Sequence, residues 1–246
     1  MTSIVGIKCK DGIVIGADSS ATFSINGQFP IMEQPIEKIE VIGGKVIVAG
    51  TGQIGLGQRF CAVVKKIWDE KGFQKTDIEV AKLLSRSGIQ DFSETNAKQG
   101  GYGALVAFPA DHKFGLCEFS VDTFQPELKT EKLWYVSMGS AQPITDPFLA
   151  FIREIFWNDG LPNVNQAAFA VTWILDHAIR INAGGVNGPI RVAVLELKKN
   201  QFEARLLSED EIGEHKQNVD AIKKHIGMFK LQNEGADSIN LPNKPN

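Results

Sequence analysis

The chain has 246 residues, 43% of them hydrophobic and 22% charged, a composition typical of a soluble globular protein with a sizeable core. Its formal net charge of -3 disfavours nucleic-acid binding and a polybasic membrane anchor, because both need clustered positive charge. The sequence shows neither a signal-peptide pattern nor the roughly 18 uninterrupted apolar residues of a membrane span. Three widely spaced cysteines without a CxxC pair indicate free thiols in a reducing compartment, so we expect a cytoplasmic protein.

The first fifty residues predict two strand pairs. Residues 2–9 and 12–18 are β-rich runs joined at a Lys-Asp-Gly turn, and Asp-Gly between such runs is a strong hairpin signal. After a looser stretch around residues 26–27, a second pair is predicted over residues 36–42 and 45–49. The last of these runs is apolar throughout from its second residue, which predicts a strand covered on both faces.

The rest of the chain predicts helix pairs between groups of strands. Apolar residues at helical spacing and capping boxes predict helices over residues 60–68, 76–84, 147–157, 166–181 and 208–226. Apolar β-rich runs predict strands over residues 102–108, 113–120, 133–138, 190–197 and 202–207. Because no strand-helix-strand alternation occurs, this order favours two stacked, largely antiparallel sheets with helices outside. The predicted fold class is α+β, a four-layer α/β/β/α sandwich, as a single domain over residues 1–230 with a flexible C-terminal tail over residues 231–246.

A glycine-rich turn points to a competing function. Residues 50–55 read Gly-Thr-Gly-Gln-Ile-Gly, a G-x-G-x-x-G pattern between a predicted strand and a predicted helix. A dinucleotide site also needs a second parallel strand that ends in an acidic residue about 20 residues on, and here another helix follows instead. Glycine amides at a helix N-terminus can also stabilise an oxyanion, which makes Gly50 an oxyanion-hole candidate. The remaining alternative is a tight strand-to-helix turn without a chemical role.

Thr2 follows Met1 directly and opens the first predicted strand. If Met1 is removed, as is usual before a small residue, Thr2 carries a hydroxyl and a free α-amine together. An amine with an unperturbed pKa of about 7.7 to 8 can take the hydroxyl proton at neutral pH, and N-terminal threonine is a recognised activated nucleophile. The alternative is that a threonine stands second without a chemical role.

Several motifs around Thr2 resemble one family when taken together. They are Thr-Ser-Ile-Val-Gly-Ile at residues 2–7, Lys-Asp-Gly-Ile-Val-Ile-Gly-Ala-Asp at 10–18, Ala-Thr at 21–22, Glu-Lys-Ile at 37–39 and Ala-Gly at 49–50. This set resembles the β-type subunits of the proteasome family, within the N-terminal nucleophile (Ntn) hydrolases. The start without a propeptide is similar to bacterial proteasome homologues such as the HslV peptidase. The resemblance is densest over residues 2–60 and continues in short matches at residues 102–103, 138–140 and 188–195.

The resemblance implies catalytic roles for five residues. Thr2 matches the nucleophile, Asp18 the acidic residue beside it, and Lys38 the lysine whose charge disfavours protonation of the α-amine. Gly50 matches the residue whose amide faces the developing oxyanion. Ser140 matches a serine near the terminal amine.

The chain departs from the family pattern in two places. Asn182 stands where family members usually have the aspartate of an Asp-x-x-Ser pattern, and an asparagine supplies a hydrogen bond but no charge. The segment between Thr22 and Lys38 is longer than usual, and its residues Glu33 and Glu37 have no role that the resemblance assigns.

The same resemblance implies a substrate-binding site. Thr22 matches a residue whose backbone pairs with an extended peptide, which would add to the protein as a strand. Ala21, Ile36 and Val48 would line the first substrate pocket beside Gly50. These three side chains are apolar and small to medium in size, so they favour an apolar residue before the cleaved bond.

The sequence therefore predicts a threonine-type endopeptidase that cleaves peptides or unfolded proteins. The resemblance further implies homo-oligomeric stacked rings, which an ATP-dependent unfoldase could feed. We expect no cofactor, and the four histidines show no metal-ligand spacing. Two other functions stay open: a non-catalytic ring scaffold, which a retained Met1 would favour, and an amidase acting on a small amide.

Overall fold

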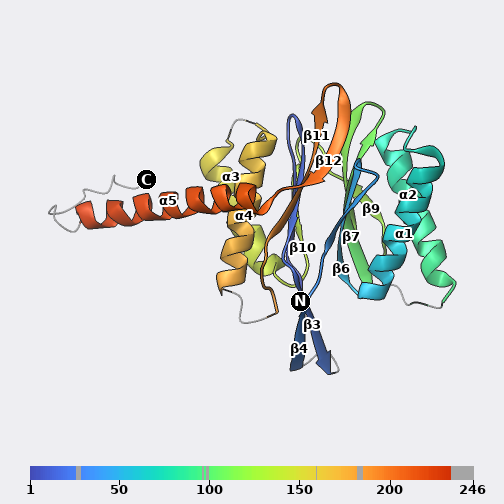
Figure 1. Cartoon of the computed structure of the whole chain (residues 1–246), viewed down its shortest axis with the longest axis horizontal. Coiled ribbons are helices and arrows are strands. Elements are labelled where there is room, and N and C mark those ends of the chain that lie inside the picture. Colours follow the sequence, from blue (N-terminus) through green and yellow to red (C-terminus); the bar gives the residue numbers. More distant parts are fainter. Residues whose placement is uncertain (26–28, 96, 98–99, 159, 182–184, 234–246) are drawn as a thin grey trace, which may run out of the picture.

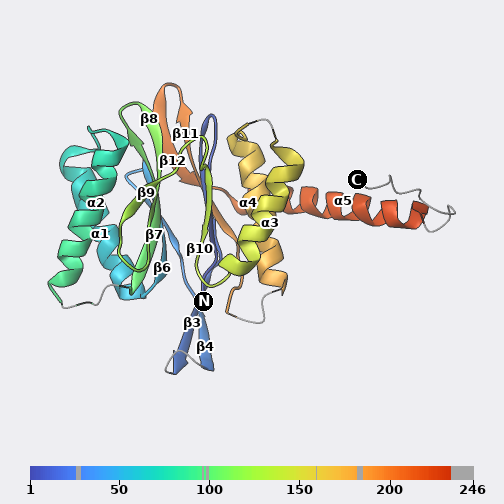
Figure 2. The ribbon, with the colours of Figure 1, turned by 180° about the vertical axis from the view of Figure 1, so that it is seen from behind.

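The chain folds into four layers, with two antiparallel sheets face to face and helices on both outer sides (Figure 1). The fold is that of a computed structural model, which describes residues 1–25, 29–95, 97, 100–158, 160–181 and 185–233. The view from behind shows the same layers (Figure 2). The α/β/β/α sandwich predicted from the order of the elements is confirmed.

The first sheet has the strand order β10-β1-β2-β11-β12. Its strands are β1 (Ile4–Lys8), β2 (Gly12–Ala17), β10 (Tyr135–Met138), β11 (Arg191–Lys198) and β12 (Gln201–Leu206). Helices α3 (Gln142–Phe156) and α4 (Val164–Ile181) cover its outer face. Helix α5 (Glu209–Asn233) continues outward from this side of the sandwich (Figures 1 and 2).

The second sheet has the strand order β5-β6-β7-β8-β9. Its strands are β5 (Ile39–Ile42), β6 (Val46–Gly52), β7 (Tyr102–Ala110), β8 (Lys113–Phe119) and β9 (Pro126–Leu128). Helices α1 (Ile54–Lys71) and α2 (Asp77–Ser93) cover its outer face. A separate hairpin of β3 (Ser20–Ile25) and β4 (Phe29–Pro35) projects from one end of the sandwich (Figure 1).

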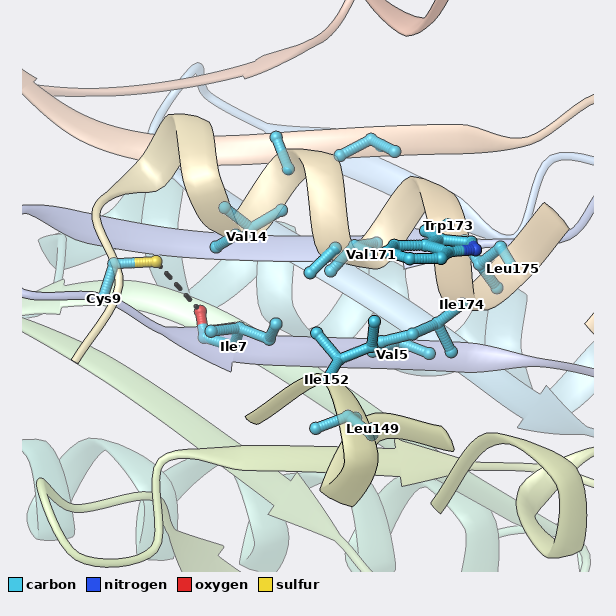
Figure 3. Packing of buried hydrophobic residues seen from close by; sticks show 14 of the residues in the cluster. Val5, Ile7, Cys9, Val14, Leu149, Ile152, Val171, Trp173, Ile174 and Leu175 are labelled. Carbon is cyan, nitrogen blue, oxygen red and sulfur yellow. Dashed lines mark hydrogen bonds between the residues drawn. The ribbon is translucent and has the colours of Figure 1, made fainter. Parts of the chain in front are cut away.

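Apolar residues fill each interface between layers. The core between the sheets includes Ile4, Ile13, Ile15, Ile47 and Leu105. Because successive side chains of a strand point to opposite faces, Val5, Ile7 and Val14 turn the other way and pack among residues of α3 and α4 (Figure 3). The same alternation holds in β6, so the strand predicted to be covered on both faces is confirmed.

The predicted capping boxes start two helices. Thr76 and Glu79 cap α2, and the amide of Ser208 donates to the Glu211 carboxylate at 2.8 Å at the start of α5. Helix α5 runs beyond the predicted end near residue 226 and takes in residues 231–233, which the sequence assigned to a tail. The remainder of that tail lies outside the described residues.

The predicted start of α3 is wrong. The helix begins at Gln142, before the predicted start at Pro147, and it holds Pro143 in its first turn. A proline is tolerated in the first turn because the amide it lacks has no intrahelical partner there. Pro147 lies inside the helix, where its missing amide leaves one bond of the ladder unmade.

The sequence also missed three strands. The residues of β3 alternate between polar and apolar, a strand signal that the prediction from the sequence overlooked. Strand β4 shows no such alternation, and β9 has only three residues. None of the described helices has the length and apolar character needed to cross a membrane.

Candidate active site

Thr2 lies two residues before β1, and the N-terminus lies where the sandwich meets the β3–β4 hairpin (Figure 1). It is buried, and its amide donates to the Ser140 hydroxyl at 3.0 Å, while its carbonyl accepts the amide of Ala141 at 3.2 Å. Strand β1 pairs with β10 in the register Ile4 to Met138, so the chain that leaves β10 turns around Thr2. The register of two strands thus places Ser140 at the N-terminus, as the resemblance implied.

Gly139 permits this close turn. Its φ of +98° is one that side chains with a Cβ rarely adopt, and a Cβ there would lie 2.4 Å from the Thr2 carbonyl oxygen. A glycine is therefore required for Ser140 to approach the Thr2 amide.

Asp18 holds the start of β1 from the neighbouring strand. Its carboxylate is fully buried and accepts the amide of Ser3 at 2.8 Å through Oδ1 and the amide of Ser20 at 3.2 Å through Oδ2. The Asp18 amide donates back to the Ser3 carbonyl at 3.1 Å, which extends the β1–β2 pairing by one residue pair. These bonds fix the backbone immediately after Thr2.

Lys38 completes the buried charge pair. Its Nζ lies 2.7 Å from Asp18 Oδ1 and donates to the carbonyl oxygen of Met1 at 3.0 Å, and its side chain is 6% exposed. Burial lowers the pKa of Lys38, whereas the charge and hydrogen bond of Asp18 oppose that shift. The ammonium is thus placed against the peptide group that joins Met1 to Thr2.

The surroundings of the N-terminus lower the pKa of the α-amine. In the intact chain the amine belongs to Met1, and the nitrogen of Thr2 is an amide. Burial, and then the positive charge of Lys38, lower the pKa of the Met1 α-amine, whereas Asp18 and Glu33 act in the opposite direction. A lowered pKa keeps more of the amine in the neutral form that a general base needs.

Gly50 lies in the interior of β6, and α1 begins only at Ile54, so the expected position at a helix N-terminus is wrong. The strand continues to Gly52 because residues 50–52 pair with β7. The Gly50 amide donates to the Lys38 carbonyl over a long 3.3 Å, and Gly50 lines the pocket beside Thr2. Its amide therefore lies at the site, although no helix dipole acts on it.

The pairing of β6 excludes a dinucleotide-binding turn at residues 50–55. In the described part of the second sheet, β6 pairs antiparallel with both of its neighbours, β5 and β7. A dinucleotide fold needs a parallel strand beside the glycine-rich turn. The G-x-G-x-x-G pattern thus joins an antiparallel strand to α1.

One pocket contains the predicted substrate residues and several others. Thr2, Lys38 and Gly50 line it, together with Ala21, Thr22, Ile36 and Val48, which the resemblance assigned to substrate binding. The Thr22 hydroxyl donates to the carbonyl of Gly185 at 3.2 Å. The sequence missed further lining residues, chiefly Glu40, Gln53, Gln58, Cys61 and Tyr102. Glu40 stands two residues after Lys38 on a strand, and this spacing was a usable signal.

Glu33 forms a hydrogen-bonded cluster with Ser20 and Asn187 beside the site, which was not predicted from the sequence. Its carboxylate contacts the Ser20 hydroxyl and accepts the side-chain amide of Asn187 at 2.6 Å. These two hydrogen bonds lower the pKa of Glu33. Asn182, which the resemblance placed in the catalytic site, lies outside the described residues.

The comparisons with solved structures agree with this fold. The Anbu (Gly-1) mutant from Hyphomicrobium sp. strain MC1 is 12% identical, with a TM-score of 0.70 over 98% of this chain and 100% of that one. Anbu (ancestral beta-subunit) from Yersinia bercovieri is 15% identical, with a TM-score of 0.69 over 97% and 100%. The structure described as the helical assembly of the Anbu complex from Pseudomonas aeruginosa is 14% identical, with a TM-score of 0.69 over 98% and 100%. At these identities the similarity shows the fold alone.

The sequence comparison goes further. No curated protein matches the chain. A family model described as "Proteasome subunit" matches residues 1–149, which is more than half of the chain and includes Thr2, Asp18, Lys38, Gly50 and Ser140. The chain belongs to the proteasome subunit family.

Proposed function

We propose that this protein is an N-terminal threonine endopeptidase with Thr2 as its nucleophile after removal of Met1. The proposal rests on one observation: side chains from separate segments of the chain meet at the peptide group that joins Met1 to Thr2. Ser140 bonds the Thr2 nitrogen, while Lys38, paired with Asp18, bonds the carbonyl on the other side of the same peptide group. Once Met1 is gone, that nitrogen is the free amine of the proposed base.

The proposed reaction uses these groups in two steps. Thr2 Oγ attacks the peptide carbonyl while its proton passes to the Thr2 amine, and the carbon–nitrogen bond breaks as that proton reaches the leaving amine. Water, deprotonated by the same amine, then hydrolyses the ester and restores Thr2. The Gly50 amide would stabilise the oxyanion by taking a second acceptor beside the Lys38 carbonyl, a contribution of about 3 to 4 kcal/mol for donors of this kind.

The charge pair tunes the base. The positive charge of Lys38 disfavours a second positive charge on the nearby amine, and the buried Asp18 carboxylate keeps the lysine in place. Ser140 can accept from the amine, as it does from the Thr2 amide here. Asn182 remains a proposed member of the site, as a hydrogen-bonding residue without charge.

We also propose that the protein acts as a homo-oligomer of stacked rings, with peptides or unfolded proteins as substrates. Phe151, Ile155 and Phe156 on α3 are 43% to 53% exposed, which is apolar surface of the kind that self-association covers. The assembly described for the Pseudomonas aeruginosa Anbu complex supports an oligomer. The stacked rings and an ATP-dependent unfoldase rest on the resemblance alone, and the free thiols Cys9, Cys61 and Cys117 support a cytoplasmic location.

Intact mass measured before and after treatment with an electrophile directed at N-terminal threonine tests the proposal. We expect a mass lacking Met1, and a further gain equal to one probe per chain. The Thr2→Ala variant should lose Met1 in the same way but gain no probe. A chain that retains Met1 and takes up no probe would instead favour the non-catalytic scaffold. Turnover of small amides without cleavage of peptides would favour the amidase.

A further inference from the structure

Glu40 places a carboxylate in the pocket beside Thr2. It belongs to β5 and pairs with Val48 of β6, which is one of the residues that the resemblance assigned to this pocket. Lys38 stands two residues earlier, next to Gly50, so the step from Lys38 to Glu40 spans roughly 7 Å along an extended chain. The segment that runs from Lys38 into β5 thus also carries an acid into the pocket.

The side of the sheet on which Glu40 lies follows from its neighbours. Ile39 and Ala49 face the other sheet, because both belong to the core between the sheets. The next pair in the register, Glu40 and Val48, therefore faces the opposite way, and Val48 packs in the cluster that contains Phe60 of α1. Glu40 accordingly points into the space between β5, β6 and α1.

Glu40 shares the lining of this pocket with Cys61 of α1. Burial, and then the negative charge of Glu40 and a hydrogen bond to it, raise the pKa of the Cys61 thiol. Cys61 lies on α1 and lines the same pocket, together with Gly57 one helical turn earlier. The carboxylate is thus at the α1 wall of the pocket.

The side chains that line the pocket include more carboxylates than ammonium groups. Its charged side chains are Glu37, Lys38 and Glu40, and the charge of Lys38 is already compensated by Asp18 at 2.7 Å. Neither Glu37 nor Glu40 forms a salt bridge to any residue that the structure describes. An exposed carboxylate without a salt bridge, beside the apolar walls of this pocket, favours a cation.

We propose that this pocket takes the side chain of lysine or arginine before the cleaved bond, with Glu40 as the residue that determines this specificity. The apolar walls formed by Ala21, Ile36 and Val48 suit the methylene stem of such a side chain, and Glu40 pairs with its charged end. The inference rests on the proposed peptidase function. It replaces the prediction, made from Ala21, Ile36 and Val48 alone, that the substrate has an apolar residue before the cleaved bond.

The test compares covalent capture of two peptide electrophiles, identical except for arginine or leucine at the position before the reactive group. The full chain that begins at Thr2 is used, and adduct formation is followed by intact mass. We expect capture of the arginine probe to exceed that of the leucine probe by about twofold to fivefold, which is the scale of one solvent-exposed ion pair. Glu40→Gln should bring the ratio of arginine to leucine capture to about one, and Glu40→Lys should reverse it.

Glu37→Gln is the matched control, because it removes a neighbouring carboxylate from the same lining without altering the α1 wall. If Glu40 only charges the exposed edge of the second sheet, Glu40→Gln leaves the ratio as it was, and the inference is overturned. Faster capture of the leucine probe by the unaltered chain overturns it as well. Failure to capture either probe contradicts the proposed peptidase function itself, so the two failures are distinguishable.

Discussion

Lys38 Nζ lies 2.7 Å from Asp18 Oδ1, with the lysine side chain 6% exposed and the aspartate fully buried. A buried ion pair of this kind is costly to break, because removal of one partner leaves the other charge uncompensated in the interior. The pair also bonds the backbone at both sides of Thr2, through the Met1 carbonyl and the Ser3 amide. Stability and proposed chemistry therefore depend on the same two side chains.

Lys38→Met should destabilise the protein by about 3 to 5 kcal/mol, because Asp18 loses its partner. The free energy of unfolding from urea denaturation measures this loss. The double variant Asp18→Asn/Lys38→Met removes both charges and should recover most of the stability without any peptidase activity. Equal stabilities of the single and double variants would contradict the pairing.

Glu33→Gln should move the acidic limb of the pH profile of kcat/KM to lower pH by a few tenths of a unit. Glu33 raises the pKa of the terminal amine, so its neutralisation lets the amine lose its proton at lower pH. We expect the same groups to act on the Thr2 amine after Met1 removal. Glu37→Gln is the control, because it leaves the contacts of Glu33 with Ser20 and Asn187 intact, and an identical shift in both variants would contradict a specific role of Glu33.

Gly139→Ala should reduce covalent capture at Thr2 by at least about tenfold, because the new Cβ collides with the Thr2 carbonyl. Gly100→Ala is a matched control: Gly100 also has a positive φ, +89°, but no described atom lies within 4 Å of a Cβ placed there. Both variants should lose stability through backbone strain, and only the first should lose capture. Equal capture by the two variants would show that the Thr2 contact has no chemical consequence.

Glu211→Gln should cost stability at neutral pH and cost progressively less as the pH falls. The Arg205 side chain, with the Ser208 backbone amide, lowers the pKa of Glu211 from 4.5 to about 2. Because the folded pKa is the lower one, the stabilisation is fully present above about 4.5 and is lost as the pH falls through about 2. We expect about 1 kcal/mol or less at neutral pH, because both side chains are more than a third exposed and screened by solvent. Urea denaturation at several pH values measures the difference, which a pH-independent value would contradict.

The residues nearest Thr2 in sequence were the easiest to predict. Asp18 was assigned by the resemblance, and the β1–β2 hairpin, whose turn is marked by Asp-Gly, explains its position because the register continues to Asp18 opposite Ser3. Lys38 and Ser140 came from the resemblance alone, because nothing in local periodicity brings a residue 138 positions away to the Thr2 amide. The fold class followed from the order of the elements, which depends on many residues at once and so tolerates errors at their ends.

The errors have local physical causes. The expected start of α3 failed because Pro147 resembles a first-turn proline, whereas Pro143 fills that role. Gly50 was expected at a helix N-terminus because glycines usually end a strand, whereas here the pairing with β7 extends β6 by three glycine-rich residues, 50–52. The contact between Glu33 and Asn187 joins residues 154 positions apart, and no sequence pattern marks it.

The β3–β4 hairpin lies outside both sheets, yet it carries Ala21, Thr22 and Glu33 to the site. Its described bonds to the rest of the chain include Thr22 to the Gly185 carbonyl, Glu33 to Asn187, and the amide of Ser20 to the Asp18 carboxylate. Because its described strands pair with neither sheet, the hairpin can open with a smaller free energy than the sandwich needs to unfold. One wall of the proposed substrate cleft can therefore open and re-form while Thr2 stays fixed. If the proposed function holds, ordering of the hairpin and capture of an extended peptide are thermodynamically linked.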